Sequence, residues 1–345
     1  MSFIKINIIY CGILLLFLSC KQLEANTVIK PSVDASRDVV KDSDLIPEKP
    51  VVAVLDTIMF DSLQRHLSQN AASSAWPVKT EYPLVGAVLP FKRIVAYYGN
   101  FYSKGMGILG ALPEEEMLQK LQAEVENWKN ADSLIPVQPA IHYIAVTAQH
   151  DPGKGSKYRI RMPASQIDRA IRVAKKIGAL VFLDVQVGHS SLSEELPPLE
   201  PYLKLPDVHL GIDPEFSMKG GQVPSSVIGT FDAADVNYAS TYLDSLVTKY
   251  NLPPKILVVH RFTKGMVTNY KNIRTRPDVQ IVVDMDGWGF PAKKKTSYQT
   301  AVTTEPVQFA GLKLFYKNDA LNKSRMMEPE EVLGLYPSPI YIQYQ

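Results

Sequence analysis

Short apolar runs that end in polar or ionisable residues are the feature that most limits what this chain can fold into. Eight runs rich in Val, Ile and Leu recur without polar alternation, at residues 94–98, 140–147, 179–184, 208–213, 227–230, 255–260, 279–284 and 311–316. Runs of this kind are typical of strands buried on both faces, as in parallel sheets. The sequence therefore predicts a parallel sheet that is covered by helices.

The segments between these runs carry the spacing of helices. Residues 114–130 place apolar side chains along one helical face, and residues 165–177 and 233–250 do the same. Alternating strands and helices over about 250 residues match a (β/α)₈ barrel of the TIM type. The weakest strand is 227–230, which is short and contains a glycine. A doubly wound open sheet is the alternative, but no G-x-x-x-x-G-K-[ST] phosphate-binding loop occurs in the sequence.

The N-terminus has the pattern of an export signal. Lys5 precedes an apolar stretch at residues 8–18, which is too short for an ordinary transmembrane span. The stretch ends at Cys20 in a sequence that resembles a bacterial lipobox, although Phe17 stands where Leu, Val or Ile is usual. We expect residues 1–19 to be a signal peptide and Cys20 to be acylated, so that the protein is anchored to a membrane. The alternative is a plain signal peptide in which Cys20 falls by chance.

The remaining organisation follows from composition. Residues 20–48 are polar and predict a lipidated tether, residues 49–90 an N-terminal lead-in, and residues 91–345 the barrel. The only cysteines are Cys11 and Cys20, so the mature chain has no disulfide and no catalytic thiol. Net charge is +2 and no basic stripe occurs, which argues against nucleic acid as a partner. We expect an exported monomer of the cell envelope.

Three of the predicted strands end in a polar pair two residues apart. Residues at i and i+2 of a strand project from the same face, and barrels place their chemistry at the strands' carboxyl ends. The pairs are Asp184 and Gln186, Asp213 and Glu215, and Asp284 and Asp286. The pattern predicts an acid-lined site and an enzyme.

Asp213-Pro214-Glu215 is the sharpest local signal. Pro214 is unwelcome in a central strand, so the strand should stop there and leave Glu215 on the rim. Repulsion between the two carboxylates, together with partial burial, would raise the pKa of one of them, as a general acid near neutral pH requires. We expect Glu215 to be the acid and Asp213 to stay charged. The alternative is a rim ion pair without a catalytic role.

An Asp-x-Glu at the end of the fourth barrel strand resembles the chitinase-like and lysozyme-like glycoside hydrolases. The resemblance implies that Glu215 protonates the glycosidic oxygen and that Asp213 orients an N-acetyl group of the substrate, which acts as nucleophile. The longer chitinase motif has two further acids where this chain has Val208 and Gly211, so a general barrel glycosidase is implied rather than a chitinase. Residues 94–316 also look like a group of secreted bacterial barrel proteins with no assigned activity, through Tyr97-Tyr98-Gly99, Asp184-x-Gln186-x-Gly188, Asp213-Pro214-Glu215, Val258-Val259-His260-x-Phe262 and Asp286-Gly287.

Other strand-end residues complete the expected site. Asp284 could pair with Glu215 as a second catalytic carboxylate. Residues expected to hold a sugar are Asp184, Gln186, His260, Asp286, Trp288, Tyr97 and Tyr98. Of the two tyrosines, one should face the barrel mouth and the other a helix. Lys313 should point inward and pair with Asp284.

These residues lead to a functional prediction with two alternatives. We predict a glycoside hydrolase acting on a cell-envelope or environmental polysaccharide, without a cofactor. A non-catalytic glycan-binding lipoprotein would use the same rim. A metal-dependent hydrolase would use Asp184, His260, Asp284 and Asp286 as an oxygen and nitrogen ligand set, but no H-x-H or H-E-x-x-H occurs and we expect no metal.

Overall fold

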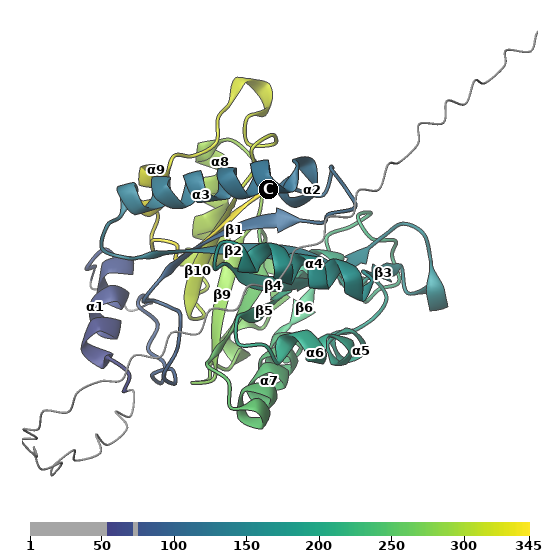
Figure 1. The fold of residues 1–345 in the computed structure, drawn as a ribbon, viewed down its shortest axis with the longest axis horizontal. Helices are drawn as coiled ribbons and strands as arrows, with labels where there is room; N and C mark the ends of the chain where they lie inside the picture. Colours follow the sequence, from purple (N-terminus) through teal and green to yellow (C-terminus); the bar gives the residue numbers. More distant parts are fainter. Residues whose placement is uncertain (1–53, 72–74) are drawn as a thin grey trace, which may run out of the picture. The chain divides into compact units, whose positions relative to one another are not determined.

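The computed structural model describes residues 54–71 and 75–345 (Figure 1). The predicted signal peptide, Cys20 and the tether lie outside these residues. Eight parallel strands pair in a closed ring, because β1 bonds to both β2 and β11. In chain order they are β1 (Arg93–Gly99), β2 (Val137–Ala148), β4 (Leu180–Val185), β5 (Val208–Ile212), β7 (Lys255–His260), β9 (Val279–Met285), β10 (Phe309–Leu314) and β11 (Tyr341–Tyr344). The fold is the predicted (β/α)₈ barrel.

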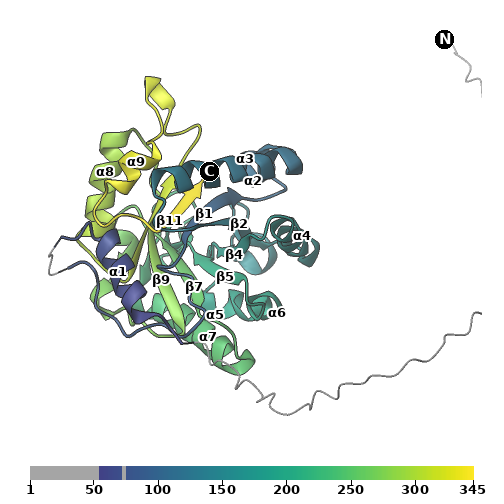
Figure 2. The same ribbon diagram turned by 60° about the vertical axis from the view of Figure 1, so that its left-hand side comes forward.

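Helices surround the ring of strands, as Figure 2 shows for α3, α4 and α7. They are α1 (Thr57–Leu67), α2 (Ile108–Ala111), α3 (Glu114–Ala131), α4 (Ala164–Lys175), α5 (Leu192–Glu195), α6 (Glu200–Leu203), α7 (Ala233–Tyr250), α8 (Pro291–Tyr298) and α9 (Pro329–Leu333). Three short strands lie outside the ring: β3 (Arg159–Arg161), antiparallel to β2, and the pair β6 (Phe231–Asp232) and β8 (Val267–Thr268). No helix of the described residues is long and apolar enough to cross a membrane.

One predicted strand is wrong and one was missed. Residues 227–230 form a loop, in which Val227 and Ile228 are exposed and Gly229 packs against the backbone after β5. The eighth strand is β11, near the C-terminus. The predicted strands at 255–260, 279–284 and 311–316 are therefore the fifth, sixth and seventh of the barrel.

The core has two parts that follow the alternation of side chains along each strand. One part lies between strands and helices, and includes Trp128 of α3 and Leu243 of α7. The other fills the barrel near the start of the strands, where Phe182, Val258 and Tyr341 belong to one cluster. The barrel interior is thus mainly apolar at its amino-terminal end, with Gln280 and His209 as buried polar exceptions, and polar toward the strands' carboxyl ends.

The lead-in closes the amino-terminal end of the barrel. Phe60, Leu63 and Leu67 of α1 join the interior cluster, together with Leu89. The backbone of Leu89 exchanges two hydrogen bonds with the Gln280 side chain of β9, at 3.0 and 2.6 Å. These contacts leave the carboxyl end as the open end, where a ligand can enter.

Candidate functional site

A cavity of about 560 Å³ opens at the carboxyl ends of the strands. Its polar lining includes Gln186, Asp213, Glu215, Asp286 and Lys313. Its apolar lining includes Tyr98, Met106, Phe262, Trp288 and Phe315. Mixed aromatic and carboxylate linings suit a ligand that has both apolar faces and hydroxyl groups.

Three carboxylates form a group in this cavity. Each of Asp213, Glu215 and Asp286 places an oxygen within 4.8 Å of the others. β5 ends at Ile212, and Pro214–Phe216 form a 3₁₀ turn in which Asp213 Oδ1 accepts the backbone N–H of Glu215 at 3.1 Å. The turn brings the two acids closer than the 6–7 Å or so of an extended strand. The strand stops before Pro214, as the sequence predicts.

Burial disfavours the ionised forms of two of these acids, Asp213 and Glu215. Burial and the nearby charge of Asp286 raise the pKa of Glu215 from 4.5 to about 7. Burial, then Asp286 and Glu215, raise the pKa of Asp213 well above its ordinary value. The expectation that Asp213 stays charged is therefore wrong, because its side chain is almost completely buried and this burial outweighs the opposing charge of His260. The charge of Glu215 makes ionisation of Asp213 less favourable still.

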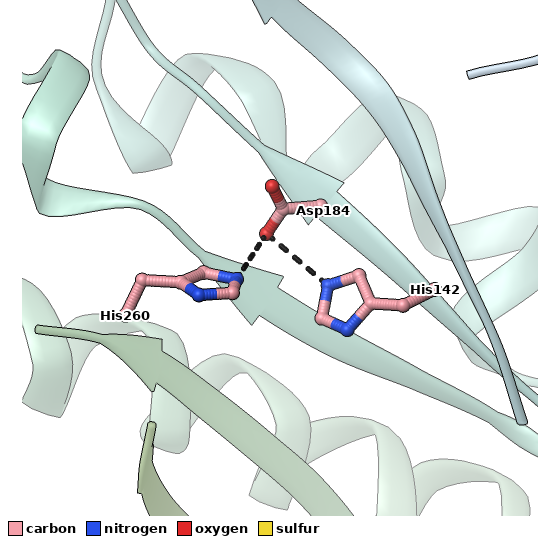
Figure 3. Close-up of side chains that lie close together, drawn as sticks. All are labelled: His142, Asp184 and His260. Carbon is pink, nitrogen blue, oxygen red and sulfur yellow. Dashed lines mark ion pairs between the residues drawn. The ribbon is translucent and has the colours of Figure 1, made fainter. Parts of the chain in front are cut away.

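A second polar cluster lies deeper in the barrel. Asp184 Oδ1 lies 3.3 Å from His142 Nε2 and 3.4 Å from His260 Nε2, so one carboxylate oxygen faces two imidazole rings (Figure 3). His260 Nδ1 lies 3.4 Å from both Asp284 Oδ2 and Asp286 Oδ2. Burial opposes a charge on His260, but Asp184 and the other two acids raise its pKa well above its ordinary value. His260 and Asp286 thus connect the deep cluster to the cavity.

Hydrogen bonds join the two levels as well. Tyr98 donates its hydroxyl to Asp184 Oδ2 at 3.0 Å. Gln186 accepts the Ala148 backbone N–H at 3.1 Å and points its amide nitrogen toward Asp213 Oδ2 at 3.4 Å. The strand-end residues of β1, β4 and β5 therefore form one continuous network.

The structure brings most of the predicted site residues together. Asp184, Glu215, His260 and Asp286 lie in one region, where the contact between His260 and Asp286 links the two clusters, but only Glu215 and Asp286 line the cavity. Trp288 stands at the cavity wall with its side chain half exposed. Whether these residues act as predicted stays a prediction.

Four predicted residues do not line the cavity. Asp184 and His260 are completely buried in the deep cluster, and Tyr97 and Asp284 lie elsewhere. Tyr97 points outward, where its hydroxyl bonds to that of Tyr316 at 2.8 Å, so Tyr98 is the tyrosine that faces the mouth. Asp284 is fully buried beneath the cavity and does not line it. The carboxylate beside Glu215 is Asp286 instead.

The position of Lys313 differs from the prediction. Its side chain points inward, but no ion pair joins it to Asp284 among the described residues. Its ammonium lies 3.7 Å from the centre of the Tyr98 ring, a cation–π contact. Lys313 also lines the cavity, and its charge lowers the pKa of Glu215 against the effect of burial.

Three buried residues of the interior were not predicted from the sequence. His142 lies in the middle of β2, and its Nδ1 lies 2.6 Å from the hydroxyl of Tyr341 and 3.0 Å from the amide of Gln343. The alternation of side chains along the strand could have identified His142. It lies two residues after Ala140, which faces the barrel interior, and so projects from the same face of β2. Strand-end reasoning missed His142 because this residue precedes the end of its apolar run.

Comparisons with known proteins leave the family open. No family model and no curated protein matches the chain. One similar solved structure is the cellulose synthase subunit Z from Clostridioides difficile, at 8% identity and a TM-score of 0.36, covering 74% of this chain and 91% of that one. A likeness this distant carries no argument about the activity of this chain.

Proposed function

We propose that this protein is a glycoside hydrolase in which Glu215 is the general acid. The observation that carries the proposal is the placement of Glu215 in the open cavity with Asp213 and Asp286 within 4.8 Å. Two carboxylates flanking a scissile bond are the machinery of most glycoside hydrolases. No Lewis acid or thiol is needed for this chemistry.

The ionisation of the group suits this role. A pKa of about 7 keeps Glu215 partly protonated at neutral pH, so it can give a proton to the leaving glycosidic oxygen. Asp286 then stabilises the positive charge that develops on the sugar ring. Retaining enzymes hold their carboxyl groups about 5–5.5 Å apart and inverting enzymes about 6.5–9.5 Å. The short separations here favour retention of the anomeric configuration.

The cavity wall supports a polysaccharide as substrate. Trp288 and Phe262 present aromatic surface on which a pyranose face can stack. Gln186 and Asp286 are placed to accept or donate hydrogen bonds to hydroxyl groups. We place the substrate among cell-envelope or environmental glycans.

Glu215→Gln tests the proposal on purified protein with aryl glycosides and peptidoglycan or chitin fragments. Turnover of a substrate with a poor leaving group should fall about 10²–10⁴-fold, while binding is kept. A substrate with an activated leaving group should lose much less, because it needs no proton. Glu116→Gln, on the exposed face of α3, is the matched control and should change nothing. Unchanged turnover in Glu215→Gln would rule out the assigned acid.

A non-catalytic glycan-binding protein is the second candidate, and the half-exposed Trp288 favours it. Such a protein would bind glycan fragments and show no turnover in the wild type. Trp288→Ala would then weaken binding about tenfold, while Glu215→Gln would have no turnover to lose.

We also propose that the protein works at the cell envelope, anchored through an acylated Cys20. The support is the sequence around Cys20 alone. Polymeric glycans of the envelope would lie within reach of a tethered barrel.

A further inference from the structure

The deep cluster of the barrel has polar atoms that its own side chains do not satisfy. Asp184 Oδ1, His142 Nε2 and both ring nitrogens of His260 are buried without a hydrogen-bond partner among the described residues. All three side chains are completely inaccessible to solvent. Leaving buried polar atoms unpaired is costly, so each such atom in a native structure calls for a ligand or another explanation.

The separations within the cluster fit a metal ion better than hydrogen bonds. The distances of 3.3 and 3.4 Å from Asp184 Oδ1 to the two Nε2 atoms exceed ordinary N–H···O lengths. Ligands held about 2.0–2.1 Å from a tetrahedral zinc ion lie about 3.3 Å from one another. The three atoms also lie within 4.8 Å of one another as a set (Figure 3).

A glycine keeps the space beside these atoms open. A Cβ at Gly211 would lie 2.4 Å from His142 Nε2 and 2.5 Å from Asp184 Oδ1. Any other residue at this position of β5 would push the two ligand atoms away. His142 Nε2 and Asp184 Oδ1 can therefore occupy their present positions only because residue 211 is a glycine.

The surroundings of the cluster match the partners that metal-binding histidines need. If His260 binds through Nε2, its Nδ1 faces Asp284 and Asp286. If His142 binds through Nε2, its Nδ1 faces the hydroxyl of Tyr341. Tyr98 holds the second oxygen of Asp184. Such outer partners fix the orientation of ligands and usually accompany a true metal site.

We infer that His142, Asp184 and His260 bind a divalent transition-metal ion inside the barrel, with zinc as the representative ion. The site lies below the carboxylates Asp213 and Glu215, and the inference does not rest on the proposed hydrolase activity. Two imidazoles and one carboxylate form a ligand set suited to Zn²⁺ or Fe²⁺. The ion would neutralise part of the negative charge of Asp184, Asp284 and Asp286.

The test uses the full-length protein, stripped with a chelator and then titrated with ZnCl₂. We expect one ion per chain by elemental analysis and a zinc-dependent rise in melting temperature. Binding should weaken more than about 100-fold in His142→Ala and Asp184→Ala, and about 10–100-fold in Asp284→Asn. His209→Gln is the matched control, because His209 is also buried in the interior but accepts the Ile256 backbone N–H instead.

A measurement on the unaltered protein keeps the test decisive if a variant does not fold. In ¹⁵N NMR of labelled histidine, zinc should shift the Nε2 signals of two of the six histidines. No retained zinc and no shifted imidazole would overturn the inference. Zinc binding that survives His142→Ala but is lost in Asp213→Asn with Glu215→Gln would also overturn it, because the ion would then belong to the upper carboxylates. Glycan turnover does not enter either readout.

Discussion

At the scale of single residues, Glu215 is set apart by its surroundings rather than by its type. It is partly buried, Asp286 is close, and the charges of Lys313 and His260 favour its ionised form. The surroundings of Glu215 as a whole disfavour its ionised form. The ionised residue therefore destabilises the folded state, and the protonated residue is available for proton transfer near neutral pH. Both consequences can be measured.

Glu215→Gln should stabilise the protein in a pH-dependent way. The pKa of Glu215 is about 4.5 when unfolded and about 7 when folded, so below pH 4.5 both states are protonated and the residue costs nothing. Between pH 4.5 and 7 only the unfolded state ionises, and the folded state loses stability. The variant should therefore gain about 1–3 kcal/mol at pH 8 and nothing at pH 4, measured by urea unfolding. An equal gain at both pH values would contradict the raised pKa.

The neighbours of Glu215 should move its pKa in opposite directions. Asp286 raises this pKa and Lys313 lowers it. A general acid is active when protonated, so kcat/KM should fall as pH rises through about 7. Asp286→Asn should move this fall to lower pH, and Lys313→Met should move it to higher pH. Shifts in the same direction for both variants would show that another group controls the profile.

At the scale of elements, the sequence reveals strands where apolar runs are long and end sharply. The strands β4, β7 and β9 are of this kind, and their Asp184, His260 and Asp284 converge as strand-end logic predicts. β11 was not predicted as a strand because its four residues include two tyrosines and a glutamine, which do not form an apolar run. Its inward-facing residues, Tyr341 and Gln343, contact His142. Their place in the interior follows only from the pairing of β11 with β1, which closes the barrel.

The helix α1 offers a matched test of the closed end of the barrel. Leu63 is 1% exposed in the interior cluster, whereas Ile58 of the same helix is 81% exposed. Leu63→Ala should lower the free energy of unfolding by about 2–4 kcal/mol, because it leaves a cavity in the packed floor. Ile58→Ala should change it by less than about 0.5 kcal/mol. Equal effects in chemical denaturation would mean that α1 does not belong to the barrel core.

At the scale of the whole molecule, the barrel combines an apolar floor with a polar mouth. The floor is packed by side chains from the strands and the lead-in, and the polar layers above it contain the deep cluster and then the open cavity. The sequence predicts that a polar mouth exists, because strand ends carry acids. It does not predict the depth of each acid, since Asp284 and Asp286 differ by two positions and yet only Asp286 reaches the cavity. The depth of a residue in the barrel depends on how far neighbouring strands are staggered relative to one another. Strand pairing sets this stagger, and the sequence of one apolar run does not reveal it.

The anchor and the barrel should be separable parts of the protein. Cys20 lies outside the described residues, and the interior core begins with α1. Cys20→Ser in a chain secreted without residues 1–19 should therefore remove acylation and move the protein from the membrane fraction to the soluble fraction, since no helix of residues 54–71 and 75–345 is long and apolar enough to cross a membrane. Its melting temperature should match that of a barrel produced without residues 1–48. Cell fractionation with labelled fatty acid measures the first effect, and calorimetry the second. If Cys20→Ser stayed with the membrane unlabelled, attachment would have to come from the barrel surface, and the tether would lose its assigned role.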